Sequence, residues 1–245
     1  MNPGEWAGGG NSVGRCSVRL PLRAGWQESG RWRHFWTRLV PGLLFLGLAS
    51  LQLGETIAEN FRTIVPGCAY RSGQLGPESL EEHIDRYHLR SVINLRGANP
   101  EDGWYQDECA VAARLGVAHY DMPTDSSFPP TAEDLRHWLE VLEHCPKPLL
   151  IHCQSGIDRT GLLAAVCVLR LDTEGSLAQA RAQLGLNHGH LPWRANRGRF
   201  LAFLDLYEEW LAGRGLAHSR EHFAQWATQV YVPLPEWANP WEVWP

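Results

Sequence analysis

The sequence predicts an α/β fold, in which a mainly parallel sheet is covered by helices on both faces. Two observations support it. From Asn60 onward, short apolar segments of strand length alternate with longer segments of helical period. The 245 residues are also enough for one domain of ordinary size with an appendage, and 44% of them are hydrophobic, as in globular proteins. The formal net charge of −5 provides no basic field for nucleic acid.

The first strands are expected at residues 62–65 and 68–71, on either side of the turn residues Pro66 and Gly67. A helix is expected at 77–87 and a buried strand at 91–96. The next helix, 103–115, ends before Gly116, a residue type that favours the left-handed C-cap. A further strand is expected at 117–122.

The helix expected at 131–142 carries Leu135, Trp138 and Leu142 on one face, and Thr131 with Asp134 forms a helix-start signature. Residues 148–152 read as a short apolar strand and 160–171 as an apolar helix. Two more helices are expected at 176–186 and 197–213.

We expect four parts along the chain. Residues 1–30 are rich in Gly, Ser and Arg without an apolar period, so they are disordered or lie upstream of the true start. Residues 31–58 contain a basic and aromatic flank and a hydrophobic, anchor-like helix. Residues 60–213 form the principal domain, and 214–245 hold a C-terminal helix and a tail rich in Trp and Pro.

The uncharged stretch 39–54 has three interpretations. As a helix, its 16 residues reach about 24 Å, slightly short of a hydrocarbon core of about 30 Å. Flanking Trp and Arg side chains could make up the difference, which gives a membrane anchor with its basic flank on the cytoplasmic side and the domain facing outward. The alternatives are a cleaved signal peptide and a helix packed on a cytoplasmic domain.

The cysteines do not form a metal-binding pattern. No Cys-x-x-Cys pair or compact Cys/His cluster is present, so we expect no metal. An even count leaves disulfides open, although the spacing does not suggest a disulfide scaffold. The six residues are Cys16, Cys68, Cys109, Cys145, Cys153 and Cys167.

The segment that carries chemistry lies between a predicted buried strand and an apolar helix. Such a connection gathers backbone N–H groups and the positive end of the helix around one point, which favours an anion. Gly156 lets the backbone curl inward where a side chain would obstruct. The segment is His152-Cys153-Gln154-Ser155-Gly156-Ile157-Asp158-Arg159-Thr160-Gly161. The residues expected to bind phosphate are Gln154, Ser155, Gly156, Ile157, Asp158 and Arg159.

Cys153 is the expected nucleophile. The loop N–H groups and the Arg159 guanidinium favour its thiolate, which is the reactive form. The planar fork of Arg159 suits two phosphoryl oxygens, and the same donors can stabilise the transition state. The Thr160 hydroxyl can ease the departure of the sulfur, so we expect a cysteinyl-phosphate intermediate that water then hydrolyses. For His152 we expect only a structural role in orienting the loop.

With this loop, the sequence resembles the protein tyrosine and dual-specificity phosphatase superfamily, whose signature is His-Cys, five residues, Arg, and Ser or Thr. The segments at 70–75 (YRSGQL), 92–96 (VINLR) and 158–161 (DRTG) look like its bacterial dual-specificity-like branch. The resemblance covers roughly residues 61–207. It implies the cysteine-phosphatase fold, with a central sheet of four or five strands and neither a metal nor an organic cofactor.

The resemblance also implies an aspartate general acid on the loop after the strand that precedes the phosphate loop. Asp125 lies at that place, while Asp121 belongs to the strand. Asp158 is the rival, because some lipid phosphatases of the superfamily carry Asp there. Arg71 and Arg96 could line the pocket and hold a second phosphate or an acidic substrate, but an arginine at such a place more often closes an ion pair near the sheet end.

The function that follows is hydrolysis of phosphate monoesters, with a protein tyrosine or dual-specificity phosphatase as the leading interpretation. Inositol phosphates or phospholipids are the alternative substrates, and a non-catalytic phosphate-binding module is the second alternative. The expected partner is a phosphorylated protein, small molecule or lipid, without nucleic acid and with possible membrane association through residues 39–54.

Overall fold

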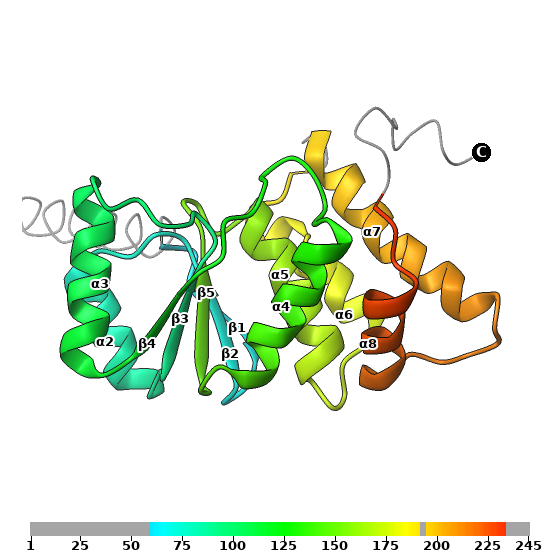
Figure 1. Ribbon diagram of the computed structural model, residues 1–245, viewed down its shortest axis with the longest axis horizontal. Coiled ribbons are helices and arrows are strands. Elements are labelled where there is room, and N and C mark those ends of the chain that lie inside the picture. Colours follow the sequence, from blue (N-terminus) through cyan, green and yellow to red (C-terminus); the bar gives the residue numbers. More distant parts are fainter. Residues whose placement is uncertain (1–58, 192–194, 234–245) are drawn as a thin grey trace, which may run out of the picture. The chain divides into compact units, whose positions relative to one another are not determined.

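The part of the chain that the computed structural model describes, residues 59–191 and 195–233, contains a five-stranded sheet between two layers of helices (Figure 1). The strand order is β1-β2-β5-β3-β4, and only β1 runs antiparallel to its neighbour. The predicted α/β class and mainly parallel sheet are therefore confirmed, with five strands in a mixed sheet. The strands are β1 Arg62–Val65, β2 Ala69–Ser72, β3 Ser91–Asn94, β4 Ala118–Asp121 and β5 Leu149–His152.

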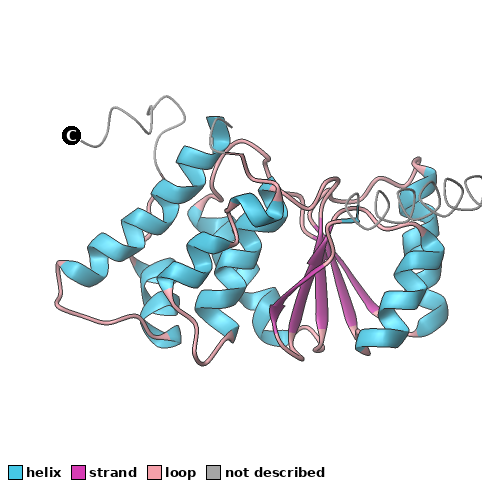
Figure 2. Cartoon of the chain, turned by 180° about the vertical axis from the view of Figure 1, so that it is seen from behind, coloured by secondary structure: helices cyan, strands magenta, loops and turns pink. Residues whose placement is uncertain are grey.

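The two faces of the sheet carry different helices. Helices α2 (Pro77–Tyr87) and α3 (Gly103–Leu115) cover one face, and the remaining helices lie on the other, as both views show (Figures 1 and 2). Because successive strand residues point to opposite faces, Val92 and Leu150 join the core under α2 and α3, whereas Ile93 and Ile151 join the larger core. Burying each such side chain stabilises the fold by about 1.5–3 kcal/mol.

Helix α5 (Asp158–Leu171) is the centre of the larger core. All its residues from Thr160 to Leu169 are buried, which explains why this segment is apolar on every side. It packs against the sheet and against α6 (Leu177–Ala182), α7 (Ala195–Ala212) and α8 (Arg220–Gln229). The loop that precedes α5 is thus held between the central strand β5 and a rigid helix.

Capping residues end or begin two helices where the sequence predicted. The side chains of Thr131 and Asp134 form a reciprocal capping box at the head of α4 (Ala132–His144). Gly116 closes α3 with a φ of +67°. The prediction of one helix at 176–186 was too long, because α6 ends at Ala182 and a short 3-10 helix, η1 (Leu186–His188), follows. The carbonyl of Gln183 bonds to a buried arginine instead of continuing the helix.

Three sequence predictions lie outside the described residues: those for residues 1–30, for the basic flank and hydrophobic helix within 31–58, and for the tail from 234 onward. Within 59–191 and 195–233, no helix is long and apolar enough to cross a membrane. The five cysteines in these ranges are all free thiols.

Candidate active site

The candidate active site lies at the carboxyl end of the four parallel strands. In register across the sheet, Ser72 of β2 pairs with His152 of β5, which pairs with Asn94 of β3, which in turn pairs with Asp121 of β4. The segments that follow these strands therefore meet at one edge. Open α/β sheets bind ligands at this edge. The loop 153–157 leaves the central strand in the middle of it.

The loop presents its carbonyls outward to the surrounding protein. The Gln154 carbonyl accepts from the Gln74 N–H at 3.1 Å, and the Gly156 carbonyl accepts from Asn60 Nδ2 at 3.0 Å and from Arg71 Nη2 at 2.7 Å. Between described residues, no hydrogen bond uses the backbone N–H of residues 154–157 as donor. These N–H groups are thus available to a ligand, and they lie just before the first turn of α5, whose dipole adds positive potential.

Gly156 is required for this shape, as the sequence predicted. Its φ is +67°, a region that residues with a Cβ rarely adopt. A Cβ on Gly156 would lie 2.6 Å from the backbone of Ser72 and of Gly73. The loop therefore passes so close to the end of β2 that only hydrogen fits between them.

The residues predicted to do the chemistry lie in and beside this loop. Cys153 is 2% exposed and follows β5 directly. The Arg159 guanidinium lies half-buried on the first turn of α5 and donates from Nη1 to the Leu95 carbonyl at 3.2 Å. Thr160 is fully buried, and its Oγ1 has no hydrogen-bond partner among the described residues. Arg159 and Thr160 both lie on the first turn of α5, directly after the loop that Cys153 begins.

His152 is held by a carboxylate that the sequence analysis missed. Glu108 on α3 is only 4% exposed, and its Oε1 lies 3.1 Å from His152 Nε2 and 2.8 Å from His119 Nε2. Its Oε2 accepts from Gln74 Nε2 at 2.6 Å. Burial raises the pKa of Glu108, but the hydrogen bonds from His119 and His152 outweigh burial and bring it to about 2. A charged Glu on the same helix face as Val111 was the available signal.

The two aspartates of β4 and its following loop have different surroundings. Asp121 accepts from the Tyr105 hydroxyl at 2.5 Å and from Asn94 Nδ2 at 2.9 Å, so it is tied into the sheet end. Asp125 lies on the exposed loop beyond, where its Oδ1 accepts from the N–H groups of Ser127 at 2.6 Å and Phe128 at 3.1 Å. The structure therefore separates a structural Asp121 from an Asp125 whose carboxylate shapes an exposed loop.

Asp158 is the first residue of α5 and faces a histidine from a distant segment. Its Oδ1 lies 3.0 Å from Nε2 of His190, which is fully buried. The ring is not oriented for a hydrogen bond, although the separation is that of an ion pair. The Asp158 carboxylate thus lies both at the N-terminus of α5 and close to the His190 imidazole.

The two arginines predicted to line the pocket are placed differently. Arg96 is half-buried, stacks 3.5 Å from the Trp104 ring centroid and donates to Gln74 Oε1 at 3.0 Å. Burial and the nearby Arg159 both lower its pKa. Arg71 is fully buried and donates to the Gly156 carbonyl of the loop, so it does not line an open pocket.

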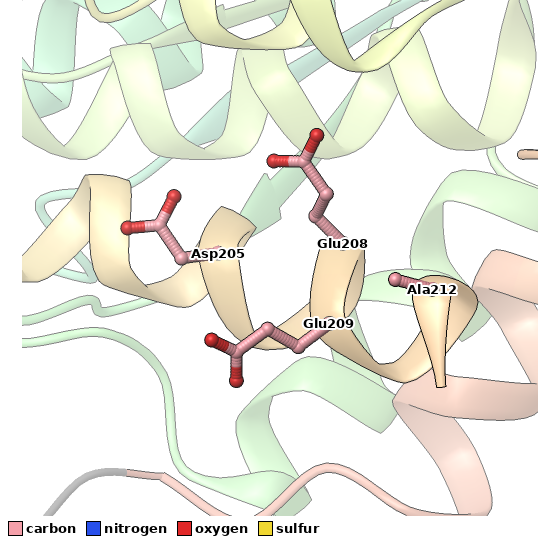
Figure 3. A pocket seen from close by; sticks show the side chains of 4 residues that line it. All are labelled: Asp205, Glu208, Glu209 and Ala212. Atoms are coloured by element: carbon pink, nitrogen blue, oxygen red, sulfur yellow. The ribbon is translucent and has the colours of Figure 1, made fainter. Parts of the chain in front are cut away.

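Two hollows are lined by residues outside the loop 153–157. One, of about 370 Å³, is bordered by Asp125, Phe128 and Trp138 and by prolines of the same loop. The other, of about 300 Å³, is lined on α7 by Asp205, Glu208, Glu209 and Ala212 (Figure 3). Its three carboxylates disfavour a phosphate. Among the described residues, no group of three His, Cys, Asp or Glu side chains could hold a metal ion.

Sequence comparison identifies a matching family. The family model described as "DSP-PTPase phosphatase fused to NAD+ Kinase" matches residues 58–190, more than half of the 245-residue chain. "Probable NAD kinase 2, chloroplastic" of Oryza sativa subsp. japonica is 26% identical over 98 residues, which cover 39% of this chain and 10% of that protein. "Dual specificity protein phosphatase CDC14A" of Homo sapiens is 24% identical over 94 residues, 38% of this chain and 15% of that protein. The chain thus matches only a small part of either relative.

Two solved structures have chain traces similar to that of this chain. The core catalytic domain of the PP-IP phosphatase SIW14 from S. cerevisiae, solved with citrate, has 24% sequence identity and a TM-score of 0.47, covering 64% of this chain and 93% of its own. TpbA of P. aeruginosa has 18% identity and a TM-score of 0.48, covering 63% of this chain and 91% of its own.

Proposed function

The chain belongs to the family of DSP-PTPase phosphatases fused to NAD+ kinase, and from this membership we propose that it hydrolyses phosphate monoesters through a cysteinyl-phosphate intermediate. One observation carries the proposal: the loop 153–157 has its carbonyls tied outward by Gln74, Asn60 and Arg71, which leaves its N–H groups for an anion in front of Cys153. A loop of this shape is suited to a phosphoryl group with three equatorial oxygens.

In the first step, the Cys153 thiolate attacks phosphorus, and the bond from phosphorus to the leaving oxygen breaks. The loop N–H groups and the Arg159 guanidinium stabilise the charge on the equatorial oxygens. Arg159 reaches this position from the first turn of α5 after exchanging its bond to the Leu95 carbonyl for the phosphoryl group. In the second step, water attacks phosphorus and the sulfur leaves as thiolate, which the unpartnered Thr160 hydroxyl can stabilise.

The test of this function is the hydrolysis of para-nitrophenyl phosphate. We expect Cys153→Ser to reduce turnover to the background rate, because a serine hydroxyl is not ionised at neutral pH. Cys68→Ser is the matched control, since Cys68 is a free thiol at the opposite end of the sheet, before β2. Equal turnover by wild type and Cys153→Ser would contradict the proposal and favour a non-catalytic phosphate-binding module.

We assign the general acid to Asp125, with Asp158 as the rival. Asp125 follows β4 at the same sheet edge as Cys153, and its exposed loop can reach a bound substrate. The acid protonates the leaving oxygen, and the resulting carboxylate then takes a proton from water. We expect Asp125→Asn to lower turnover at least about tenfold for an alkyl phosphate, whose leaving group is strongly basic. Para-nitrophenyl phosphate should be less affected.

Asp158→Asn, measured on the same two substrates, separates the candidates. If Asp125→Asn leaves the alkyl phosphate rate unchanged and Asp158→Asn lowers it, the acid is Asp158. Iodoacetamide labelling of Cys153 in both variants checks that the nucleophile remains reactive.

For the substrate class, we propose phosphotyrosine or other phosphorylated side chains of proteins, with inositol phosphates or phospholipids as the alternative. The similarity to a human dual specificity protein phosphatase supports the first. A panel of phosphotyrosine peptides, phosphoinositides and phosphatidylglycerophosphate separates the classes by kcat/KM. NADP+ belongs in the panel, because the family description names an NAD+ kinase and NADP+ carries a phosphate monoester.

A further inference from the structure

Arg71 lies beneath the phosphate loop and is completely enclosed. It is 0% exposed and extends from β2, the strand next to the one that carries Cys153. Its Nη2 donates to the Gly156 carbonyl at 2.7 Å. Its Nη1 lies 2.9 Å from both the backbone carbonyl and the side-chain Oε1 of Gln183, at the end of α6. All three acceptors are neutral amide oxygens.

The charge of Arg71 has no carboxylate partner in the described residues. No Asp or Glu oxygen lies within 4.0 Å of its guanidinium there, and its Nε has no hydrogen-bond partner. Burial lowers the pKa of Arg71 to about 10, while the Cys153 thiolate acts in the opposite direction. The guanidinium therefore stays charged at neutral pH. It lies one strand away from β5, which leads directly into Cys153, and it donates to the Gly156 carbonyl of the loop that Cys153 begins.

A buried, unpaired charge is costly for a folded protein. Removing a guanidinium from water carries a desolvation cost that neutral hydrogen-bond acceptors offset only in part. Proteins therefore pair such groups or use them at functional sites. In the proposed reaction, the negative charge opposite Arg71 is carried first by the Cys153 thiolate and then by the phosphoryl oxygens.

Other charged and titratable groups lie on the elements around Cys153. Arg159 and Asp158 lie on the first turn of α5, Arg96 follows β3, and His152 of β5 contacts Glu108 of α3. His188, whose pKa burial and Arg71 lower to about 4, is neutral at the pH of the reaction. Arg71 differs from Arg159 and Arg96 because it cannot reach the substrate.

We propose that Arg71 is a buried positioning residue whose uncompensated positive charge stabilises the Cys153 thiolate from beneath the phosphate loop, while its bond to the Gly156 carbonyl holds the loop N–H groups toward the phosphate. The proposal rests on the proposed function, since it assigns the thiolate as the reactive form. It predicts that neutralising this charge, without removing Arg71, makes the thiolate less stable.

Gln183→Glu performs that neutralisation. Because Gln183 Oε1 already lies 2.9 Å from Arg71 Nη1, the new carboxylate forms an ion pair with almost no change in shape. The measurement is the rate at which iodoacetamide labels Cys153 as a function of pH, followed by mass spectrometry of the Cys153 peptide. We expect the midpoint of the profile to rise by on the order of one pH unit, so that labelling below the midpoint slows about tenfold.

Two controls isolate the cause. Gln179→Glu makes the same charge change on an exposed residue of the same helix, and Gln183→Met keeps the size without adding charge. Both should label with the wild-type profile. Arg71→Lys keeps the positive charge but loses the planar guanidinium that bonds to the Gly156 carbonyl. It should keep the labelling midpoint of wild type and lose turnover, because the loop is no longer held in place.

A midpoint in Gln183→Glu that matches Gln179→Glu would overturn the proposal and leave Arg71 as a scaffold alone. The thermal stability of Gln183→Glu should equal or exceed that of wild type. A change in the labelling midpoint would therefore not come from unfolding. Labelling does not require phosphate hydrolysis. A shifted midpoint in a protein without phosphatase activity would therefore reject the proposed function and keep the role of Arg71.

Discussion

Replacing Glu108 by Gln removes the charge that holds His152 behind the nucleophile. The carboxylate lies within hydrogen-bond distance of His119, His152 and Gln74, and only 4% of the residue is exposed. Burial opposes ionisation of Glu108, but its hydrogen bonds hold the pKa at about 2, against an ordinary value of 4.5. This difference corresponds to on the order of 3 kcal/mol of stabilisation at neutral pH.

The pH dependence gives the sign of the effect. A carboxyl whose pKa is depressed by folding contributes its full stabilisation above the unfolded value, near pH 4.5, and loses it as the pH falls toward 2. We therefore expect Glu108→Gln to lower the free energy of unfolding by on the order of 3 kcal/mol at pH 7. By pH 3, the difference in free energy of unfolding between wild type and Glu108→Gln should fall to roughly 1.5 kcal/mol.

Urea denaturation of both proteins between pH 7 and pH 3 measures this gap. Glu81→Gln is the control, because Glu81 forms an exposed ion pair with Arg114 and its loss should hardly change stability. A gap that stays constant from pH 7 to pH 3 would refute the reasoning, since the effect would then come from packing and not from the charge of Glu108.

Two further predictions concern local geometry. Gly156→Ala should lower kcat/KM for para-nitrophenyl phosphate about 100-fold, because its Cβ meets the backbone of Ser72 at 2.6 Å and the loop must move. Gly67 has the same φ of +67° but open space around it. Gly67→Ala should therefore lower the free energy of unfolding by about 1 kcal/mol and leave activity unchanged. An equal loss of activity in Gly67→Ala and Gly156→Ala would contradict the argument from close approach. Thr131→Ala removes the capping box with Asp134 and should lower the free energy of unfolding by about 1 kcal/mol in urea titrations, without changing KM; an unchanged midpoint would show that the cap contributes nothing.

Much of the fold could be predicted because its signals are local. The 103–115 helix and its Gly116 cap, the Thr131 capping box and the apolar strand before Cys153 each depend on residues a few positions apart. The length of α6 was not predictable in this way. It ends where the Gln183 carbonyl bonds to Arg71, which lies 112 residues earlier in the chain.

The sequence alone predicts where the loop lies, because Cys153, Gly156 and Arg159 fall within one short segment between an apolar strand and an apolar helix. The groups that surround the loop come from distant segments, which meet only in the folded chain. The pairing of β2, β3 and β4 with β5 brings Arg71 beneath the loop, and α3 brings Glu108 against His152, 44 residues away. Arg71 and Glu108 are buried among groups that the register of the sheet brings together. The spacing of residues along the chain cannot predict such burial.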